Sequence, residues 1–417
     1  MREKIEKMIL SAEESLKDSF LEQERIEEKR TRQVLDIFRS HEISYRHFSS
    51  TTGYGYDDVG RDTLESVWAD VFHTEAALMR PHIASGTAAL SLTLFGLTRP
   101  GDRILSATGL PYDTLLRVLG IGKNAFPGSL KEYGVEFDMV DLRPDGSIDL
   151  EAVERAIRPE TTLVIAQRSR GYAWRPSLMP EAFEPLAEMI HASHPGVRLM
   201  VDNCYGEFVR EKEPTDFGAD VCVGSLIKNP GGGIAPTGGY VAGSAEAVDR
   251  VAWRLTAPGL GRELGSYAGD YRPYYQGLFM APHTVCQAVK TAMLAARLFE
   301  NLGLEVSPSG SEKRADIIQS IRMDSPERLV AFCQGIQTAS PVDSMALPEP
   351  WDMPGYEDQI VMAAGTFVAG ASIELSCDGP IRPPYTAYMQ GGLTYTHGRI
   401  AMAEALNRMA ENGSIKL

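Results

Sequence analysis

The sequence predicts an α/β protein with a large, mostly parallel sheet covered by helices on both faces, followed by a smaller α+β domain. From about residue 65, short apolar runs alternate with helix-like stretches, which is typical of parallel sheets. A long helical stretch begins at about residue 283 and ends at Gly303, and a charged, helix-like segment precedes the alternation. We therefore divide the chain into an N-terminal helical arm (1–50), a large domain (51–282) and a small C-terminal domain (283–417).

Composition excludes several classes of protein. The net charge of −15 argues against a nucleic-acid partner. The N-terminus is charged throughout and no run of 18 apolar residues occurs, so we expect no signal peptide and no membrane association. The five cysteines lack zinc-ligand spacing, which predicts free thiols in a reducing cytoplasm and no metal site.

The N-terminal arm, residues 2–39, reads as a long helix, continuous or interrupted. Apolar residues such as Ile5, Ile9, Leu16 and Val34 recur at helical spacing among many charges. We expect this amphipathic helix to pack on its own body or on a partner subunit. Its polar face is mixed in sign, which disfavours a membrane-surface helix.

Five apolar runs read as strands of the large sheet, and residues 149–157 read as a helix capped by Asp149. Ligands of such sheets lie beyond the carboxyl ends of the strands. Polar residues that follow the apolar runs are therefore the candidate site residues. The runs are RILSA (103–107), VEFDMV (135–140), LVIA (163–166), VRLMV (197–201) and VCVG (221–224).

Asp202 and Lys228 follow two successive runs. A carboxylate at Asp202 either caps the next turn or pairs with a pyridinium nitrogen. Lys228 lies in GSLIKNPGGG, where the glycines allow close backbone approach. A Walker A loop is excluded because the glycines come after the lysine. A lone loop lysine is usually solvated, but the placement of both residues at strand ends favours a functional pair.

Two further elements are weaker when taken singly. Ser85, Gly86 and Thr87 open an apolar helical stretch, where free backbone N–H groups and the helix dipole can bind an anion; a simple N-cap is the alternative. Tyr112, in LPYDT, either stacks on a planar ring or is an ordinary core or surface tyrosine.

One motif is rejected. Residues 120–125 match GxGxxA, but they follow a helix-like segment and precede a Pro-Gly loop. A dinucleotide fingerprint requires a strand before it and a helix after it. We therefore interpret Gly120 as a helix C-cap and expect no NAD site.

Taken in order, SGT, PYDT, VDNCYGEF and GSLIKNPGGG resemble fold-type-I enzymes dependent on pyridoxal 5′-phosphate (PLP). The closer resemblance is to the Cys/Met-metabolism branch described as methionine γ-lyase-like or aluminium-resistance proteins, which is cystathionine β-lyase-like. It extends over most of residues 51–395. The matching segments are TTGYGYDDVGRDTLE, IASGTAALSLTLFGLTRPGD, QRSRGYAWRPSL, SLIKNPGGGIAPTGGYVAG and ASIELSCDGPIRPPYTAYMQGGLTY.

The resemblance implies the fold-type-I PLP-dependent transferase fold, PLP as cofactor and a role for each candidate residue. Lys228 would carry PLP as a Schiff base, Asp202 would pair with the pyridine nitrogen and Tyr112 would stack on the ring. Arg382 would bind the substrate carboxylate. The remaining implied contacts are Ser85, Gly86, Thr87 and Ser225 to the phosphate, Gln167 and Ser169 near the 3-hydroxyl, and Tyr54, Tyr56 or Arg61 to the phosphate of a neighbouring subunit.

The sequence differs from related lyases at two places, and both differences bear on the leaving-group chemistry more than on cofactor binding. Related lyases carry a hydroxyl residue directly before the lysine, where this chain has Ile227, and PYDT replaces a YGGT-like turn. The predicted function is a carbon–sulfur lyase for a methionine- or cystathionine-type amino acid, acting by β or γ elimination. Lys228 would be the base and Tyr112 a candidate acid. Alternatives are an aminotransferase, an aldolase or a non-catalytic PLP-binding protein. We expect a homotetramer built from dimers.

Overall fold

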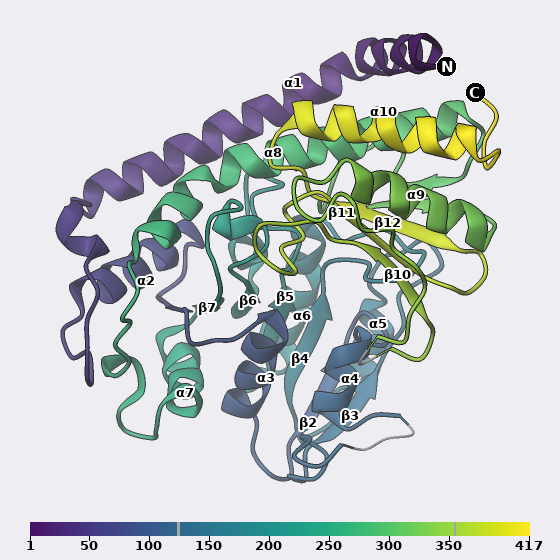
Figure 1. Ribbon diagram of the computed structural model, residues 1–417. Helices are drawn as coiled ribbons and strands as arrows, with labels where there is room; N and C mark the ends of the chain where they lie inside the picture. The colour runs from purple at the N-terminus through teal and green to yellow at the C-terminus, as the bar shows by residue number, and fades with distance from the viewer. Residues whose placement is uncertain (123–125, 354–355) are drawn as a thin grey trace.

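The computed structural model describes residues 1–122, 126–353 and 356–417. Two sheets are joined by a long helix, α8 (Arg272–Asn301), and helix α1 (Arg2–Ser40) lies along it (Figure 1). The C-terminal helix α10 (Tyr395–Glu411) lies beside both helices. The chain ends meet, since Lys4 Nζ donates a hydrogen bond to the Leu417 carbonyl oxygen.

The large sheet has the strand order β1-β7-β6-β5-β4-β2-β3, and of these strands only β7 runs against the others. The five predicted strands are confirmed as β2 to β6, whereas β1 and β7 were not predicted. The bounds are β1 Ala76–Arg80, β2 Arg103–Ser106, β3 Glu136–Met139, β4 Thr161–Gln167, β5 Arg198–Asp202, β6 Val221–Ser225 and β7 Gly239–Gly243.

The apolar runs are nearly continuous because both faces of the sheet are covered. Along β5, Leu199 and Val201 belong to one hydrophobic core, while Met200 belongs to the other. Asp149 caps its helix by accepting a hydrogen bond from Ala152 N, and Gly120 is a helix C-cap at φ 80°. The rest of the rejected motif, residues 123–125, lies outside the described residues.

The helices that cover this sheet belong to two layers. Helices α1, α2, α5, α6 and α8 contribute to the core that contains Leu199, and α3, α4 and α7 to the core that contains Met200. Their bounds are α2 Val59–Val71, α3 Gly86–Leu97, α4 Asp113–Leu119, α5 Leu150–Ala156, α6 Glu184–Ser193 and α7 Ala245–Leu255. The 3₁₀ turns are η1 Tyr45–Phe48, η2 Pro180–Phe183, η3 Pro214–Phe217, η4 Asn229–Gly231 and η5 Gly261–Glu263.

The small domain is built on an antiparallel sheet of order β10-β11-β12-β9-β8. Helix α8 starts well before the predicted position, and Pro282 lies inside it; burial of Tyr275 and Leu278 stabilises the additional turns. The proposed boundary at residue 283 thus falls within a helix that serves both cores. The bounds are β8 Val306–Ser307, β9 Gln319–Arg322, α9 Pro326–Thr338, β10 Ile360–Ala363, β11 Ser376–Pro380 and β12 Thr386–Gln390.

Helix α1 is continuous, and its apolar face is buried within its own chain. Ile5 and Ile9 pack into the core of the small domain, and Leu16 and Val34 into that of the large domain. Of the two packing modes left open by the sequence, the structure thus shows the intramolecular one. Within the described ranges, no helix is both long and apolar enough to span a bilayer.

Candidate functional site

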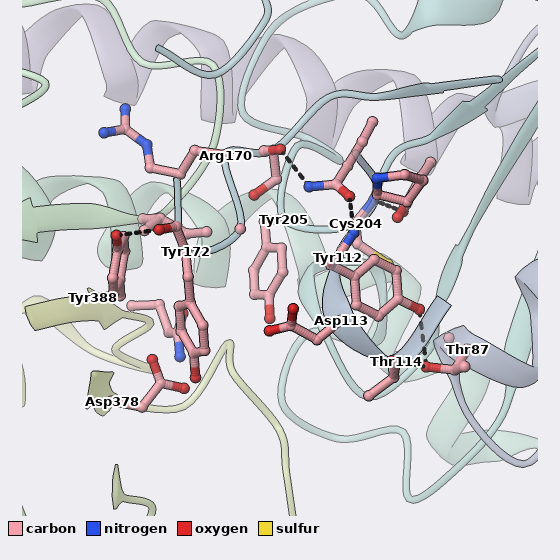
Figure 2. Close-up of a pocket in the computed structure, with 18 of the residues that line it drawn as sticks. Thr87, Tyr112, Asp113, Thr114, Arg170, Tyr172, Cys204, Tyr205, Asp378 and Tyr388 are labelled. Carbon is pink, nitrogen blue, oxygen red and sulfur yellow. Dashed lines mark hydrogen bonds between the residues drawn. The ribbon is translucent and has the colours of Figure 1, made fainter. Parts of the chain in front are cut away.

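A cavity of about 580 Å³ lies at the carboxyl ends of β4, β5 and β6 and reaches the strands of the small domain. This is the edge of the sheet from which the candidate residues were chosen. Figure 2 shows side chains from both domains around it. The predicted residues that line it are Ser85, Gly86, Thr87, Tyr112, Gln167, Ser169, Asp202, Ser225, Lys228 and Arg382.

Lys228 projects into the cavity from the loop after β6. Its Nζ atom lies over the Tyr205 ring, 4.0 Å from the ring centroid. The glycines that follow Lys228 allow this loop to pack directly on α8. A Cβ on Gly231 would collide with the backbone of the loop itself, and a Cβ on Gly232 would collide with the backbone of α8. The glycines were predicted to allow the backbone to approach another group closely, and that group is helix α8. The contact between the loop and α8 holds Lys228 in place.

Asp202 ends β5 and faces the same cavity. Its Oδ1 accepts a hydrogen bond from Cys204 N at 3.1 Å, so the carboxylate caps a turn and also lines the cavity. Burial raises the pKa of Asp202, against the opposing charge of Lys228. Burial acts to lower the pKa of Lys228, but Cys204, Tyr205 and Asp202 raise it above its ordinary value, which favours the ammonium form.

The start of α3 forms a tight cradle. Ser85 is the N-cap, accepting a hydrogen bond from Ala88 N at 3.1 Å, and Gly86 and Thr87 begin the helix. A Cβ on Gly86 would lie 3.2 Å from Ser225 Cβ, so glycine keeps the cradle open. The first N–H groups of a helix have no partner within it, and with the dipole they suit an anion the size of a phosphate.

Tyr112 and Gln167 are fixed by the chain around them. The Tyr112 hydroxyl is hydrogen-bonded to Thr87 Oγ1 at 2.9 Å. Gln167 accepts from Tyr112 N at 3.1 Å and donates to the Ser169 carbonyl at 2.9 Å, so its amide positions Tyr112. Ser169 Oγ is buried without a hydrogen-bond partner in the described part of the chain, which leaves a hydroxyl free for a ligand.

Arg382 lies at the mouth of the cavity. Its side chain is 51% exposed, and Nη1 forms an ion pair with Asp358 Oδ2 at 2.8 Å. Burial raises the pKa of the nearby Asp113 carboxyl, while the positive charge of Arg382 acts to lower it. The other guanidinium nitrogens are not used by that pair, so the side chain can still approach a substrate.

The candidates at residues 54–61 lie elsewhere. Tyr54 and Tyr56 are exposed and stack on each other, with ring centroids 5.6 Å apart. Arg61 is buried and donates to the carbonyl oxygens of Gly55 and Gly265. Its guanidinium is therefore turned into its own chain, and only the two tyrosines are placed to reach another molecule.

The cavity also contains residues that sequence reasoning missed. On the small-domain side, Asp378 of β11 stands opposite Tyr388 of β12, and the Tyr388 hydroxyl donates to the Tyr172 carbonyl oxygen at 2.7 Å (Figure 2). Burial raises the pKa of Asp378 to about 7, opposed by hydrogen bonding from Tyr172 and Gln390 and by the charge of Lys228. Residues two apart along a strand point to the same face of the sheet. The spacing of Tyr388 and Gln390 on β12 is therefore a sequence signal that could have placed both side chains on one face.

A buried ionic network supports the site from behind. Arg168 and Asn203 directly follow Gln167 and Asp202, and Arg168 Nη1 donates to Asn203 Oδ1 at 2.7 Å. Glu213 accepts from Asn203 Nδ2 at 3.0 Å and from Arg30 of α1 at 2.8 Å. The ends of β4 and β5 are thus tied to the N-terminal helix.

Comparison with known proteins agrees with this geometry. Residues 5–410 match the methionine gamma-lyase family. The chain is 50% identical to the protein YnbB of Bacillus subtilis (strain 168), over 93% of this chain and 92% of the relative. A solved structure of a carbon–sulfur lyase involved in aluminium resistance from Clostridium novyi NT is 48% identical, with a TM-score of 0.94, covering 98% of this chain and 96% of that one.

A solved Bacillus cereus protein is 49% identical, with a TM-score of 0.94, and the match covers 97% of this chain and 99% of that one. The likeness therefore extends over both domains. On the extent of the family match and of these relatives, the chain belongs to the methionine gamma-lyase family, a family of PLP-dependent enzymes.

Proposed function

We propose that this protein is a PLP-dependent carbon–sulfur lyase that acts on a sulfur amino acid of the methionine or cystathionine type by β or γ elimination. The observation that carries the proposal is the convergence of Lys228, Asp202 and the N-terminus of α3 on one cavity. The carbon–sulfur lyase from Clostridium novyi NT supports the reaction class, because it matches this chain over both domains.

The residues present fit PLP. The cradle at Gly86 suits the phosphate, the unpartnered Ser169 hydroxyl suits the 3-hydroxyl, and Asp202 is a carboxylate for the pyridine nitrogen. When bound, PLP supplies an electron-withdrawing ring that stabilises negative charge at the substrate Cα. Lys228 is the amine to which it would attach.

The protein's own side chains would do the rest. Asp202 would keep a proton on the ring nitrogen, which preserves the electron-withdrawing character of the ring. Tyr112 would hold the ring by stacking, and Arg382 would orient the substrate carboxylate. The Lys228 amine, once free, would remove the Cα proton.

The test is product analysis on the purified protein, given a panel of sulfur amino acids with and without a keto-acid acceptor. A lyase releases thiol, keto acid and ammonia without an acceptor, and Lys228→Ala removes all three. Amino transfer that depends on the acceptor, aldol cleavage, or the absence of any product would each contradict the proposal. The last result would favour a non-catalytic PLP-binding protein.

A further inference from the structure

The leaving sulfur needs a proton, and Tyr112 is poorly placed to give it. Its hydroxyl is hydrogen-bonded to Thr87 at the cradle end of the cavity. Burial, together with the charge of Asp202, raises the pKa of Tyr112 far above its ordinary value. A general acid works best when its pKa lies near the operating pH, so a donor on the side of the cavity away from Thr87 would suit a departing sulfur better than Tyr112.

Asp378 meets the geometric requirement. It lines the same cavity as Lys228 but comes from β11 of the small domain, on the side away from Tyr112 (Figure 2). Its Oδ1 is buried and receives no well-formed hydrogen bond from the residues that the structure describes, although the side chains of Tyr172 and Gln390 lie close enough to the carboxyl to favour its ionised form. A buried carboxyl oxygen without a partner is costly to keep, and one that faces a substrate cavity is available to the substrate.

We infer that Asp378 is the general acid that protonates the departing sulfur, an inference that rests on the proposed lyase function. As the carbon–sulfur bond breaks, its electron pair stays on sulfur. The carboxyl O–H of Asp378 transfers its proton to that sulfur, which yields a neutral thiol and leaves Asp378 as a carboxylate. Solvent returns the proton after the thiol departs.

The surroundings of Asp378 leave a large fraction of its carboxyl protonated near neutral pH. Among the described residues that act most strongly on its pKa, Lys228 is the cation and favours the carboxylate, while burial favours the neutral acid and brings the pKa to about 7. An ordinary thiol has a pKa of about 8.5, so proton transfer to a leaving thiolate runs downhill. The ionisable groups that face Asp378 are Tyr172 after β4, Tyr205 after β5, Lys228 after β6, Tyr356 before β10, Cys377 beside it and Tyr388 on β12.

The experiment compares two leaving groups on one amino-acid skeleton, an S-alkyl cysteine and β-chloroalanine. Chloride leaves without a proton, whereas an alkyl thiolate needs one. Asp378→Asn should lower kcat/KM for the S-alkyl substrate by roughly 10²- to 10⁴-fold and leave the chloride substrate close to wild type. The control, Asp36→Asn, changes an exposed residue of α1 that forms an ion pair with Arg39 and should alter neither rate.

A second measurement needs no variant. In the wild-type protein, the ratio of the S-alkyl rate to the chloride rate should fall as pH rises through about 7. The infrared carboxyl band lost in Asp378→Asn should titrate over the same range, whether or not substrate turns over. Equal slowing of both substrates, a ratio independent of pH, or a carboxyl that titrates near an ordinary aspartate pKa of about 3.9 would overturn the assignment.

The two proposals fail differently. If wild-type protein eliminates neither thiol nor chloride, the lyase function and the role of Asp378 both fall. If it eliminates both but Asp378→Asn does not discriminate between them, only the acid assignment is wrong.

Discussion

The buried carboxylate of Glu213 provides the sharpest test of how the site is held. It accepts hydrogen bonds from Arg30 Nη2 at 2.8 Å, Phe208 N at 2.9 Å and Asn203 Nδ2 at 3.0 Å, and it lies 3.4 Å from Arg168 Nη1. Its side chain and that of Arg30 are each 1% exposed. Glu213→Gln would therefore leave two buried guanidinium groups without their counter-charge.

Breaking a buried ion pair by removing one partner costs about 3–5 kcal/mol. We expect the lower end of that range, because Arg30 keeps Gln33 Oε1 at 2.7 Å and Arg168 keeps Asn203 Oδ1 at 2.7 Å. Because Asn203 and Arg168 adjoin Asp202 and Ser169, the affinity for PLP should fall as well.

Glu211→Gln is the matched control, since Glu211 pairs with Lys29 on the surface and its loss should cost about 0–1 kcal/mol. Urea unfolding gives the stability of each variant, and absorbance titration with PLP gives the affinity. Equal stability of the two variants would refute the reasoning, because it would mean that the buried network contributes no more than a surface pair.

Four further predictions concern the site and the assembly. The purified protein should be yellow, borohydride reduction should fix PLP to Lys228 in peptide maps, and labelling of another lysine would disprove the assignment. Asp202→Ala should keep the fold, judged by circular dichroism, and lose most activity because the ring nitrogen loses its proton; an active variant would make Asp202 a turn cap only. Arg382→Lys should raise KM strongly, since an ammonium cannot reproduce a two-pronged guanidinium–carboxylate contact, and unchanged kinetics would place the carboxylate site elsewhere. We also propose a homotetramer of dimers with shared sites: inactive Lys228→Ala subunits mixed with inactive Tyr54→Ala/Tyr56→Ala subunits should regain activity, whereas hybrids that form but stay inactive would show that each site is built from one chain.

The strands β2 to β6 and the residues at their carboxyl ends could be predicted from local sequence alone. These strands are buried on both faces, so each appears as an apolar run, and Asp202 and Lys228 follow their runs directly. The strand β7 was missed because glycines at both ends of GYVAG replace the apolar pattern. Those glycines are required by close packing, as a Cβ on Gly239 would lie 2.7 Å from Ile83 Cγ2.

Which distant residues share the cavity depends on how the two domains pack together. Asp378 lines the same cavity as Lys228 because of the register of β11 on β12 and the placement of the small domain, and neither follows from local spacing. The orientation of the Arg61 side chain likewise depends on residues distant in sequence, because its guanidinium donates hydrogen bonds to the carbonyl oxygens of Glu263 and Gly265. Neighbours along the chain share a strand end because backbone geometry is local, whereas the contacts of a long polar side chain depend on which segments pack around it.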